Sequence, residues 1–259
     1  MDSRPIGVFD SGIGGISILK ELVKTLPEEK FIYFGDSANA PYGTKDKAEI
    51  HSLVCKVTDY LLSRDCKSLV IACNTATSVS AHTLRETHPD IPIIGVEPAL
   101  KPAVLSKPNP RVLVMATHVT LTEQKFLNLM NQYTDTANIL TCQCNGLVEY
   151  IEQGVLDGPE LESYLRSTLA PYITPLPDAV VLGCTHYPFI KPTVQKLLGD
   201  TVQLFDGSLG TAKELKRRLE LNGLSASGTS YNSVKKQVEI INSLNTDYII
   251  DLSYKLLQN

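Results

Sequence analysis

The sequence predicts an α/β fold made of two similar lobes, each built on a mainly parallel sheet. Short apolar runs rich in β-branched residues alternate with longer stretches of helical period, which is typical of βαβ units. The same alternation recurs after about 110 residues. The length of 259 residues, at roughly 150 residues per domain, leaves room for one large domain or two small ones.

Four strands with intervening helices are expected in the first hundred residues. A strand over 6–9 leads to a helix over 16–26, whose apolar residues share one face and which Pro27 ends. A strand over 31–34, a helix over 50–61, a strand over 69–72, a helix over 75–87 and a strand over 92–96 follow. This order predicts a parallel sheet with crossover helices.

The second half repeats the pattern. A strand over 112–115 leads to a helix whose start carries a capping box, Thr120 with Glu123. Strands over 139–142, 179–182 and 202–205 are expected, with helices over 147–151 and from Pro159. The segments 233–242 and 247–257 are both helical in period, and we expect this tail to pack back on the first lobe.

The ends of equivalent strands indicate an internal duplication. Four pairs of residues share nearly the same offset: Asp10 with Ala116, Asp36 with Cys144, Cys73 with Cys184, and Glu97 with Asp206. Chance alignment of generic βα units is the alternative. We expect a first lobe of residues 1–96 and 207–259 and a second lobe of residues 97–206, related by a pseudo-twofold axis with the active site in the cleft between them.

Composition excludes several classes of protein. Twenty-four basic and 28 acidic residues give a net charge of −4, and the absence of any Lys/Arg cluster argues against a nucleic-acid partner. No run approaches 18 apolar residues, and the first strand begins too early for a signal peptide, so we expect no membrane partner and a cytoplasmic location. The six cysteines form no C-x-x-C pair, and we expect free thiols.

Polar residues follow directly after the expected strands, where ligands bind in open parallel sheets. The residues concerned are Asp10, Ser11 and Gly12 after the first strand, Asp36, Tyr42 and Gly43 after the second, Cys73, Asn74 and Thr75 after the third, and Thr117, His118, Cys184, Thr185 and His186 in the second lobe. The glycines near Asp10 resemble a dinucleotide fingerprint. However, its third glycine would be Ser17, and Asp10 would face the pyrophosphate. An ammonium group suits Asp10 better.

Cys73 and Cys184 occupy equivalent places in the two repeats. Two thiols opposed across a cleft suit inversion at a carbon acid: one thiolate removes the α-proton and the opposite thiol protonates the other face. His186 can lower the pKa of the Cys184 thiol, and Asp10 or Asp36 can serve Cys73. A buried, purely structural His186 is the alternative, and a zinc site of Cys73, Cys184 and His186 is disfavoured because paired-ligand spacing is lacking.

An acidic substrate also needs hydrogen-bond donors. Hydroxyls and backbone amides at helix starts can bind its carboxylates, and these same residues could instead be helix caps: Ser11, Asn74, Thr75 and Thr185. The remaining cysteines lack such settings and are expected to be core residues or incidental: Cys55, Cys66, Cys142 and Cys144.

Over nearly its whole length the chain resembles the glutamate racemases. Four blocks carry the resemblance: 10–17 (DSGIGGIS), 35–43 (GDSANAPYG), 72–77 (ACNTAT) and 182–188 (LGCTHYP). The resemblance implies that Cys73 and Cys184 are the acid/base residues, assisted by Asp10 and His186, and that Glu152 lies near the second thiol. It also implies a substrate pocket lined by Asp10, Ser11, Tyr42, Gly43, Asn74, Thr75, Thr185 and His186.

The activity implied is interconversion of L- and D-glutamate without pyridoxal phosphate, metal or nucleotide cofactor. It would supply D-glutamate for peptidoglycan, and thus for cell-wall biogenesis and cell shape, in a homodimeric enzyme. Residues 95–102 resemble the version in relatives that depend on a cell-wall nucleotide precursor as activator. The alternatives are an aspartate racemase, a related one-thiol decarboxylase, or a non-catalytic protein that binds an acidic amino acid.

Overall fold

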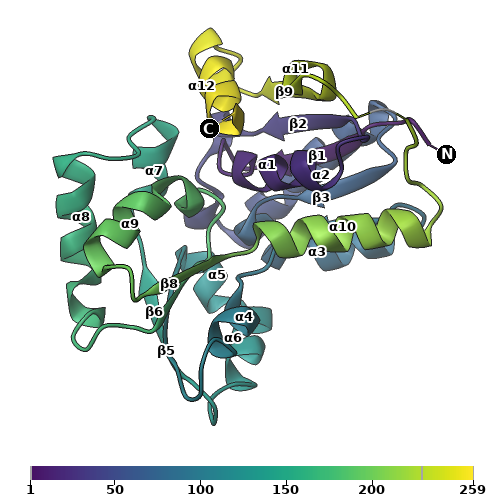
Figure 1. Cartoon of the computed structure of the whole chain (residues 1–259). Helices are drawn as coiled ribbons and strands as arrows, with labels where there is room; N and C mark the ends of the chain where they lie inside the picture. Colours follow the sequence, from purple (N-terminus) through teal and green to yellow (C-terminus); the bar gives the residue numbers. More distant parts are fainter. Residues whose placement is uncertain (1, 229, 259) are drawn as a thin grey trace. The chain divides into compact units, whose positions relative to one another are not determined.

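The computed structural model describes residues 2–228 and 230–258, and the chain divides into two compact units (Figure 1). Unit 1 is formed by Met1–Val96 with Ser208–Asn259, and unit 2 by Glu97–Gly207. The sequence analysis expected the second unit to end at residue 206, one residue before the end observed at Gly207. Each unit carries one sheet in which all strand pairs are parallel. The predicted α/β class with two mainly parallel sheets is confirmed.

Unit 1 has a five-stranded sheet in the order β4-β3-β1-β2-β9. Its strands are β1 (Ile6–Asp10), β2 (Phe31–Gly35), β3 (Ser68–Ile71), β4 (Ile93–Gly95) and β9 (Val238–Asn242), and its helices are α1 (Ile16–Thr25), α2 (Lys47–Ser63), α3 (Asn74–Thr87), α10 (Ser208–Leu221), α11 (Val234–Gln237) and α12 (Asp247–Gln258). All residues of β1 and β3 are buried, so helices cover both faces of the sheet. Helix α1 packs against α10 and α12, whereas α2 packs against α3.

Unit 2 has a four-stranded sheet in the order β6-β5-β7-β8. Its strands are β5 (Arg111–Ala116), β6 (Asn138–Gln143), β7 (Ala179–Leu182) and β8 (Gln203–Asp206), and its helices are α4 (Leu100–Val104), α5 (His118–Thr122), α6 (Gln124–Asn131), α7 (Leu147–Glu152), α8 (Pro159–Leu169) and α9 (Lys191–Leu198). Successive β5 residues alternate between two hydrophobic cores: Leu113 and Met115 enter one, and Val112 and Val114 the other.

The two sheets share one strand order. If β1 to β4 are matched with β5 to β8 in sequence, unit 1 has the order 4-3-1-2 and unit 2 the corresponding order 8-7-5-6. The strand β9 is an addition at the edge of the first sheet, next to β2. The two units therefore have the common topology that the predicted repeat requires.

Two local predictions are wrong. Residues 233–242 do not form one helix, because the single turn α11 is followed by β9. The run 238–241 (VEII) is short and rich in β-branched residues, and pairing with the open edge of β2 decides its conformation. The capping box also fails: Thr117, not Thr120, caps the helix after β5, and Glu123 is extended and separates α5 from α6.

No helix among the described residues has the length and apolar character needed to cross a membrane.

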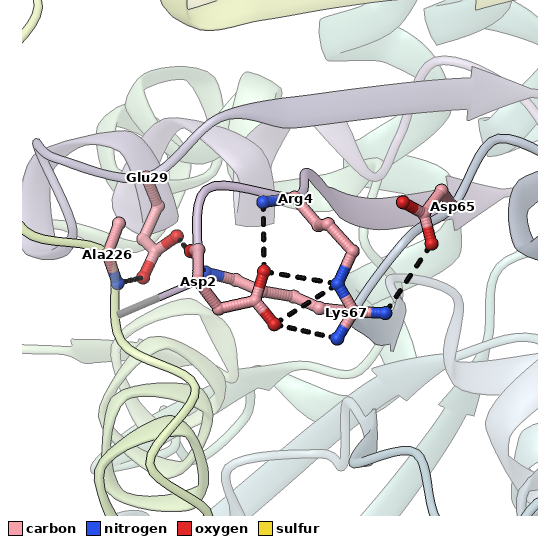
Figure 2. Close-up of polar contacts among 6 residues, drawn as sticks. All are labelled: Asp2, Arg4, Glu29, Asp65, Lys67 and Ala226. Carbon is pink, nitrogen blue, oxygen red and sulfur yellow. Dashed lines mark hydrogen bonds and ion pairs between the residues drawn. The ribbon is translucent and has the colours of Figure 1, made fainter.

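A buried ion pair joins the segments that precede β2 and β3 (Figure 2). Lys67 Nζ lies 2.7 Å from Glu29 Oε2, and the side chains are 0% and 4% exposed. The nitrogen also donates to the Asp2 carbonyl at 2.6 Å, and Glu29 Oε1 accepts from Ala226 N at 2.8 Å. Through these contacts the buried ion pair connects the segments of Asp2, Glu29, Lys67 and Ala226 near the amino-terminal ends of the strands of unit 1.

Candidate active site

The predicted site residues of unit 1 gather at the carboxyl ends of its strands. Asp10 is the last residue of β1, Asp36 follows β2, and Cys73 lies two residues beyond β3. The Asp36 amide donates to the Asp10 carbonyl at 3.0 Å, and the Ala72 amide donates to the Phe9 carbonyl at 2.7 Å. These backbone bonds continue the ladder past the strand ends and hold the three segments at one edge of the sheet.

Cys73 sits at the start of α3 with polar partners for its sulfur. The thiol is 5% exposed, donates to Ser11 Oγ at 3.7 Å and accepts from the Ala76 amide at 3.5 Å. An amide at a helix start directed at sulfur favours negative charge there. Asn74 and Thr75 occupy the first turn of the same helix and are buried. Ser11, Asn74 and Thr75, which the sequence suggested as donors to a carboxylate, thus contact Cys73 or follow it directly in the chain.

The carboxylate of Asp10 holds the turn between β1 and α1. It is fully buried, and Oδ2 accepts from the amides of Gly12 at 3.3 Å and Gly15 at 2.9 Å. Gly15 leaves no room for a side chain, since a Cβ would lie 2.7 Å from the Asp10 Cβ. Tyr33 closes the same turn by donating to the Gly12 carbonyl at 2.7 Å. Asp10 is therefore fixed in place beside Ser11, the partner of Cys73.

Tyr42 and Gly43 lie in a buried 3-10 turn, Tyr42–Thr44 (η2). The Tyr42 hydroxyl donates to Asp36 Oδ2 at 2.7 Å, and the side-chain Nδ2 of Asn39 donates to both carboxylate oxygens of Asp36 at 3.0 Å. Burial, followed by the hydrogen bond and charge of Asp36, raises the pKa of Tyr42 far above its ordinary value. The sequence suggested Asp36 as a partner for Cys73, but the structure engages its carboxylate with Tyr42 and Asn39.

Unit 2 contains a thiol, an imidazole and a carboxylate in series. Cys184 lies two residues beyond β7 and is 7% exposed. Its Sγ is 3.7 Å from His186 Nδ1, and His186 Nε2 is 2.6 Å from Glu152 Oε1 at the end of α7. Thr185, between the two, is buried. The arrangement lets the imidazole exchange a proton with the thiol while the carboxylate orients the ring.

The surroundings of His186 favour its charged form. Burial is the largest influence and lowers the pKa, but hydrogen bonds to Cys184 and Glu152 and their charges outweigh it and raise the pKa well above 6.5. A histidine with a raised folded-state pKa stabilises the fold fully below its unfolded pKa. That contribution is lost as the pH rises through the folded value. The two partners thus shift the equilibrium of the His186 ring toward the imidazolium.

Replacing Glu152 by Gln is expected to lower the pKa of His186. The change keeps the side-chain shape but removes a charge that favours the imidazolium, while the cost of burial remains. Titration of the His186 ring by NMR measures the shift, and Glu149→Gln, an exposed change on the same helix, is the control. An unchanged titration in Glu152→Gln would show that the carboxylate does not set the charge of the ring.

Thr117 and His118 lie at the start of α5, directly after β5. Thr117 Oγ1 caps α5, and His118 Nδ1 lies 3.1 Å from the Gln143 side chain on the exposed surface. The predicted residues therefore form two groups, one in each unit, around Cys73 and around Cys184. Sequence reasoning from the residues missed the bonds of Asp36 to Tyr42 and of Glu152 to His186; Glu152 entered through the family resemblance alone.

Of the remaining cysteines, Cys66, Cys142 and Cys144 are buried, whereas Cys55 on α2 is partly exposed, and all six thiols are free. Cys142 and Cys144 are buried with their sulfurs 3.8 Å apart. The hydrogen bond between the two sulfurs, together with burial, raises the pKa of Cys144 well above 9.0. Burial also raises the pKa of Cys66 to about 11 and raises that of Cys55. These settings keep the thiols of Cys55, Cys66 and Cys144 protonated near neutral pH.

A surface cavity of unit 2 lies away from the predicted site residues. Among the residues that the structure describes, no three His, Cys, Asp or Glu side chains are grouped so that they could hold a metal ion. A cavity of about 520 Å³ lies at the opposite, amino-terminal end of the unit 2 sheet, lined in part by Asn109, Met130 and Asn138. It contains none of the predicted site residues.

The fold and the two groups define an α/β protein in which each sheet carries a buried cysteine with a polar partner just beyond a strand end. The sequence model of the Asp/Glu/Hydantoin racemase family matches residues 6–215. A glutamate racemase of Clostridium perfringens (strain 13 / Type A) is 48% identical over 258 residues, covering 100% of this chain and 98% of the relative. The chain belongs to the Asp/Glu/Hydantoin racemase family.

Solved structures agree. Glutamate racemase from Francisella tularensis in complex with D-glutamate has a TM-score of 0.84 and 32% identity, covering 100% of this chain and 95% of that one. The Escherichia coli glutamate racemase, in complex with L-glutamate and the activator UDP-MurNAc-ala, has a TM-score of 0.83 and 29% identity, covering 98% and 94%. The resemblance that the four sequence blocks carry is thereby confirmed.

Proposed function

We propose that the chain is a glutamate racemase that interconverts L- and D-glutamate by proton transfer between two thiols and Cα. One observation carries the proposal: each sheet presents a buried cysteine two residues after its equivalent strand, with a polar partner on the sulfur. The full-length similarity to glutamate racemases supports glutamate as the substrate. We further propose that the two units, related by a pseudo-twofold axis, close on one substrate molecule.

In the proposed reaction, one thiolate takes the Cα proton and leaves a carbanion, and the opposite thiol gives its own proton to the other face. The net change is inversion at carbon with no redox step, and the second sulfur ends as the thiolate. Reversal of the roles produces the opposite enantiomer. His186, held by Glu152, assists Cys184, and Asp10 assists Cys73. Proton carriers of this kind accelerate reactions by about 10² to 10⁴.

The proposed substrate pocket uses neutral donors rather than Lys or Arg. Backbone amides and hydroxyls at helix starts bind carboxylates, and Asp10 attracts the ammonium group. The proposed lining consists of Asp10, Ser11, Tyr42, Gly43, Asn74, Thr75, Thr185 and His186, all of them buried. Their burial excludes water from the reacting atoms, which strengthens each polar contact with substrate.

The wider setting is proposed on the same basis. The enzyme needs no pyridoxal phosphate, metal or nucleotide cofactor, works in the cytoplasm as a homodimer, and supplies D-glutamate for peptidoglycan. Two observations make UDP-MurNAc-ala a candidate activator: the sequence of residues 95–102, and the complex of the Escherichia coli glutamate racemase with this compound.

Circular dichroism of amino-acid solutions tests the proposal directly. Chelator-treated protein without pyridoxal phosphate is expected to bring both L- and D-glutamate to zero ellipticity, much faster than either enantiomer of aspartate. Parallel reactions with UDP-MurNAc-ala reveal any activation. Preferential racemisation of aspartate would indicate an aspartate racemase, and release of CO₂ would indicate a decarboxylase. Binding of glutamate without turnover would indicate a non-catalytic binding protein.

A further inference from the structure

Two residues at the end of β9 bind the turn that follows β2. Asn242 is 3% exposed, and its Nδ2 donates to Ser37 Oγ at 2.8 Å while Oδ1 accepts from the Leu244 amide at 3.0 Å. Ser243 Oγ accepts from the Ala38 amide at 2.9 Å. The contacts to Ser37 and Ala38 each span 205 residues of sequence. A segment near the end of the chain therefore fixes a turn near its beginning.

The sheet is built to bring Asn242 close. Gly35 and Asn242 face one another in the register of β2 and β9, and Ser243 N donates to the Gly35 carbonyl at 2.9 Å. A Cβ on Gly35 would lie 2.8 Å from Asn242 Nδ2 and 2.6 Å from the Gly12 carbonyl oxygen. Glycine at this position lets the amide of Asn242 reach the turn.

The turn leads directly to the predicted substrate residues. Ser37–Asn39 (η1) follows Asp36, and Asn39 donates to the Asp36 carboxylate, which in turn accepts from Tyr42. Hydrogen bonds thus connect Asn39 and Tyr42 to the Asp36 carboxylate, and Asn242 binds the turn that begins with Ser37.

We propose that Asn242 is a positioning residue, which holds the Ser37–Asn39 turn so that Tyr42 and Gly43 stand ready to receive glutamate. The inference rests on the proposed function, in which Tyr42 and Gly43 line the pocket. It adds a residue of β9 to the unit 1 part of the site, whose other members lie at or just beyond the ends of β1, β2 and β3.

A positioning role affects binding more than chemistry. Without the bond from Asn242, a smaller fraction of molecules holds the turn in the binding-competent form, and the apparent affinity falls by that fraction. The expected result is a rise in KM of about 5- to 10-fold, the loss equivalent to one net hydrogen bond, with kcat changed less than twofold. A structural role alone would reduce the folded fraction, and hence kcat per total protein, at constant KM.

The experiment compares Asn242→Ala, Ser37→Ala and the double variant with the unaltered protein, by glutamate racemisation with urea unfolding alongside. Glu239→Gln is the matched control, because Glu239 lies on the same strand but forms an exposed pair with Arg64 at 3.0 Å. Both single variants should raise KM, and the double variant should raise it no further than the larger single effect, because they remove the same bond. Ser37→Ala leaves the core of β9 intact and serves if Asn242→Ala fails to fold.

The outcomes separate the two proposals. If the unaltered protein and Glu239→Gln racemise glutamate while KM is unchanged in both Ser37→Ala and Asn242→Ala, the positioning role is wrong and the proposed function stands. The same conclusion follows if the two KM effects multiply in the double variant. If the unaltered protein does not racemise glutamate, the proposed function itself fails.

Discussion

Cys73→Ser and Cys184→Ser are each expected to slow racemisation of glutamate by about 10² to 10⁴, because a hydroxyl is a far weaker acid than a thiol and does not ionise to a base near neutral pH. Overall racemisation must slow equally in both directions, since the two enantiomers have the same free energy. Exchange of the Cα proton with solvent deuterium does not share this constraint. Each variant should still exchange the enantiomer whose proton faces its remaining cysteine, and the preference should reverse between the two variants.

Proton NMR in deuterium oxide measures this exchange from each pure enantiomer. Cys55→Ser is the control, because Cys55 lies on α2 with its sulfur 3.6 Å from His51, outside both thiol groups. The same enantiomer preference in both variants would contradict the two-thiol mechanism. Exchange as fast as in the unaltered protein, from both enantiomers, would remove both cysteines from the reaction.

Breaking the ion pair of Glu29 and Lys67 is expected to have the largest effect on stability. Glu29→Gln leaves a buried ammonium and Lys67→Met leaves a buried carboxylate, and each should lower the free energy of unfolding by about 3 to 5 kcal/mol. The double variant leaves no uncompensated charge, so it should lose less than either single variant. Urea unfolding with an unchanged m-value measures these differences.

Lys107→Met is the matched control. The ion pair of Lys107 with Asp178 is half-exposed and should contribute little to the free energy of unfolding. KM for glutamate should stay constant in all these variants at temperatures where they are folded, because the pair lies at the strand ends opposite the thiols. Additive losses in the double variant would show that Glu29 and Lys67 stabilise the fold independently.

The sequence predicted the sheets well because buried parallel strands appear as apolar runs, and it predicted the thiols because chemistry follows directly after such strands. It failed at 233–242, where a short apolar run has no period of its own to separate helix from strand. Asn242 was missed for the same reason. It is a polar residue at the end of a strand, but the signal is visible only once β9 is known to be a strand.

Side-chain hydrogen bonds that form only in the tertiary structure could not be predicted from the sequence either. Asp36 was named as a carboxylate near the first thiol, yet its bond to Tyr42 depends on how 37–41 turns, which residue types alone do not fix. The capping residue before α5 was misassigned by three positions, because a Thr at 117 and another at 120 both suit a helix start.

The interruption of unit 1 by unit 2 sets an order of events during synthesis. All of Glu97–Gly207 leaves the ribosome before the strand that borders β2, so the inserted unit has its complete sheet while the outer unit still has an unpaired edge. The turn that carries Ser37 must wait for some two hundred further residues before Asn242 arrives. The contacts of Ser37 with Asn242 can therefore form only after the whole of unit 2 has been synthesised.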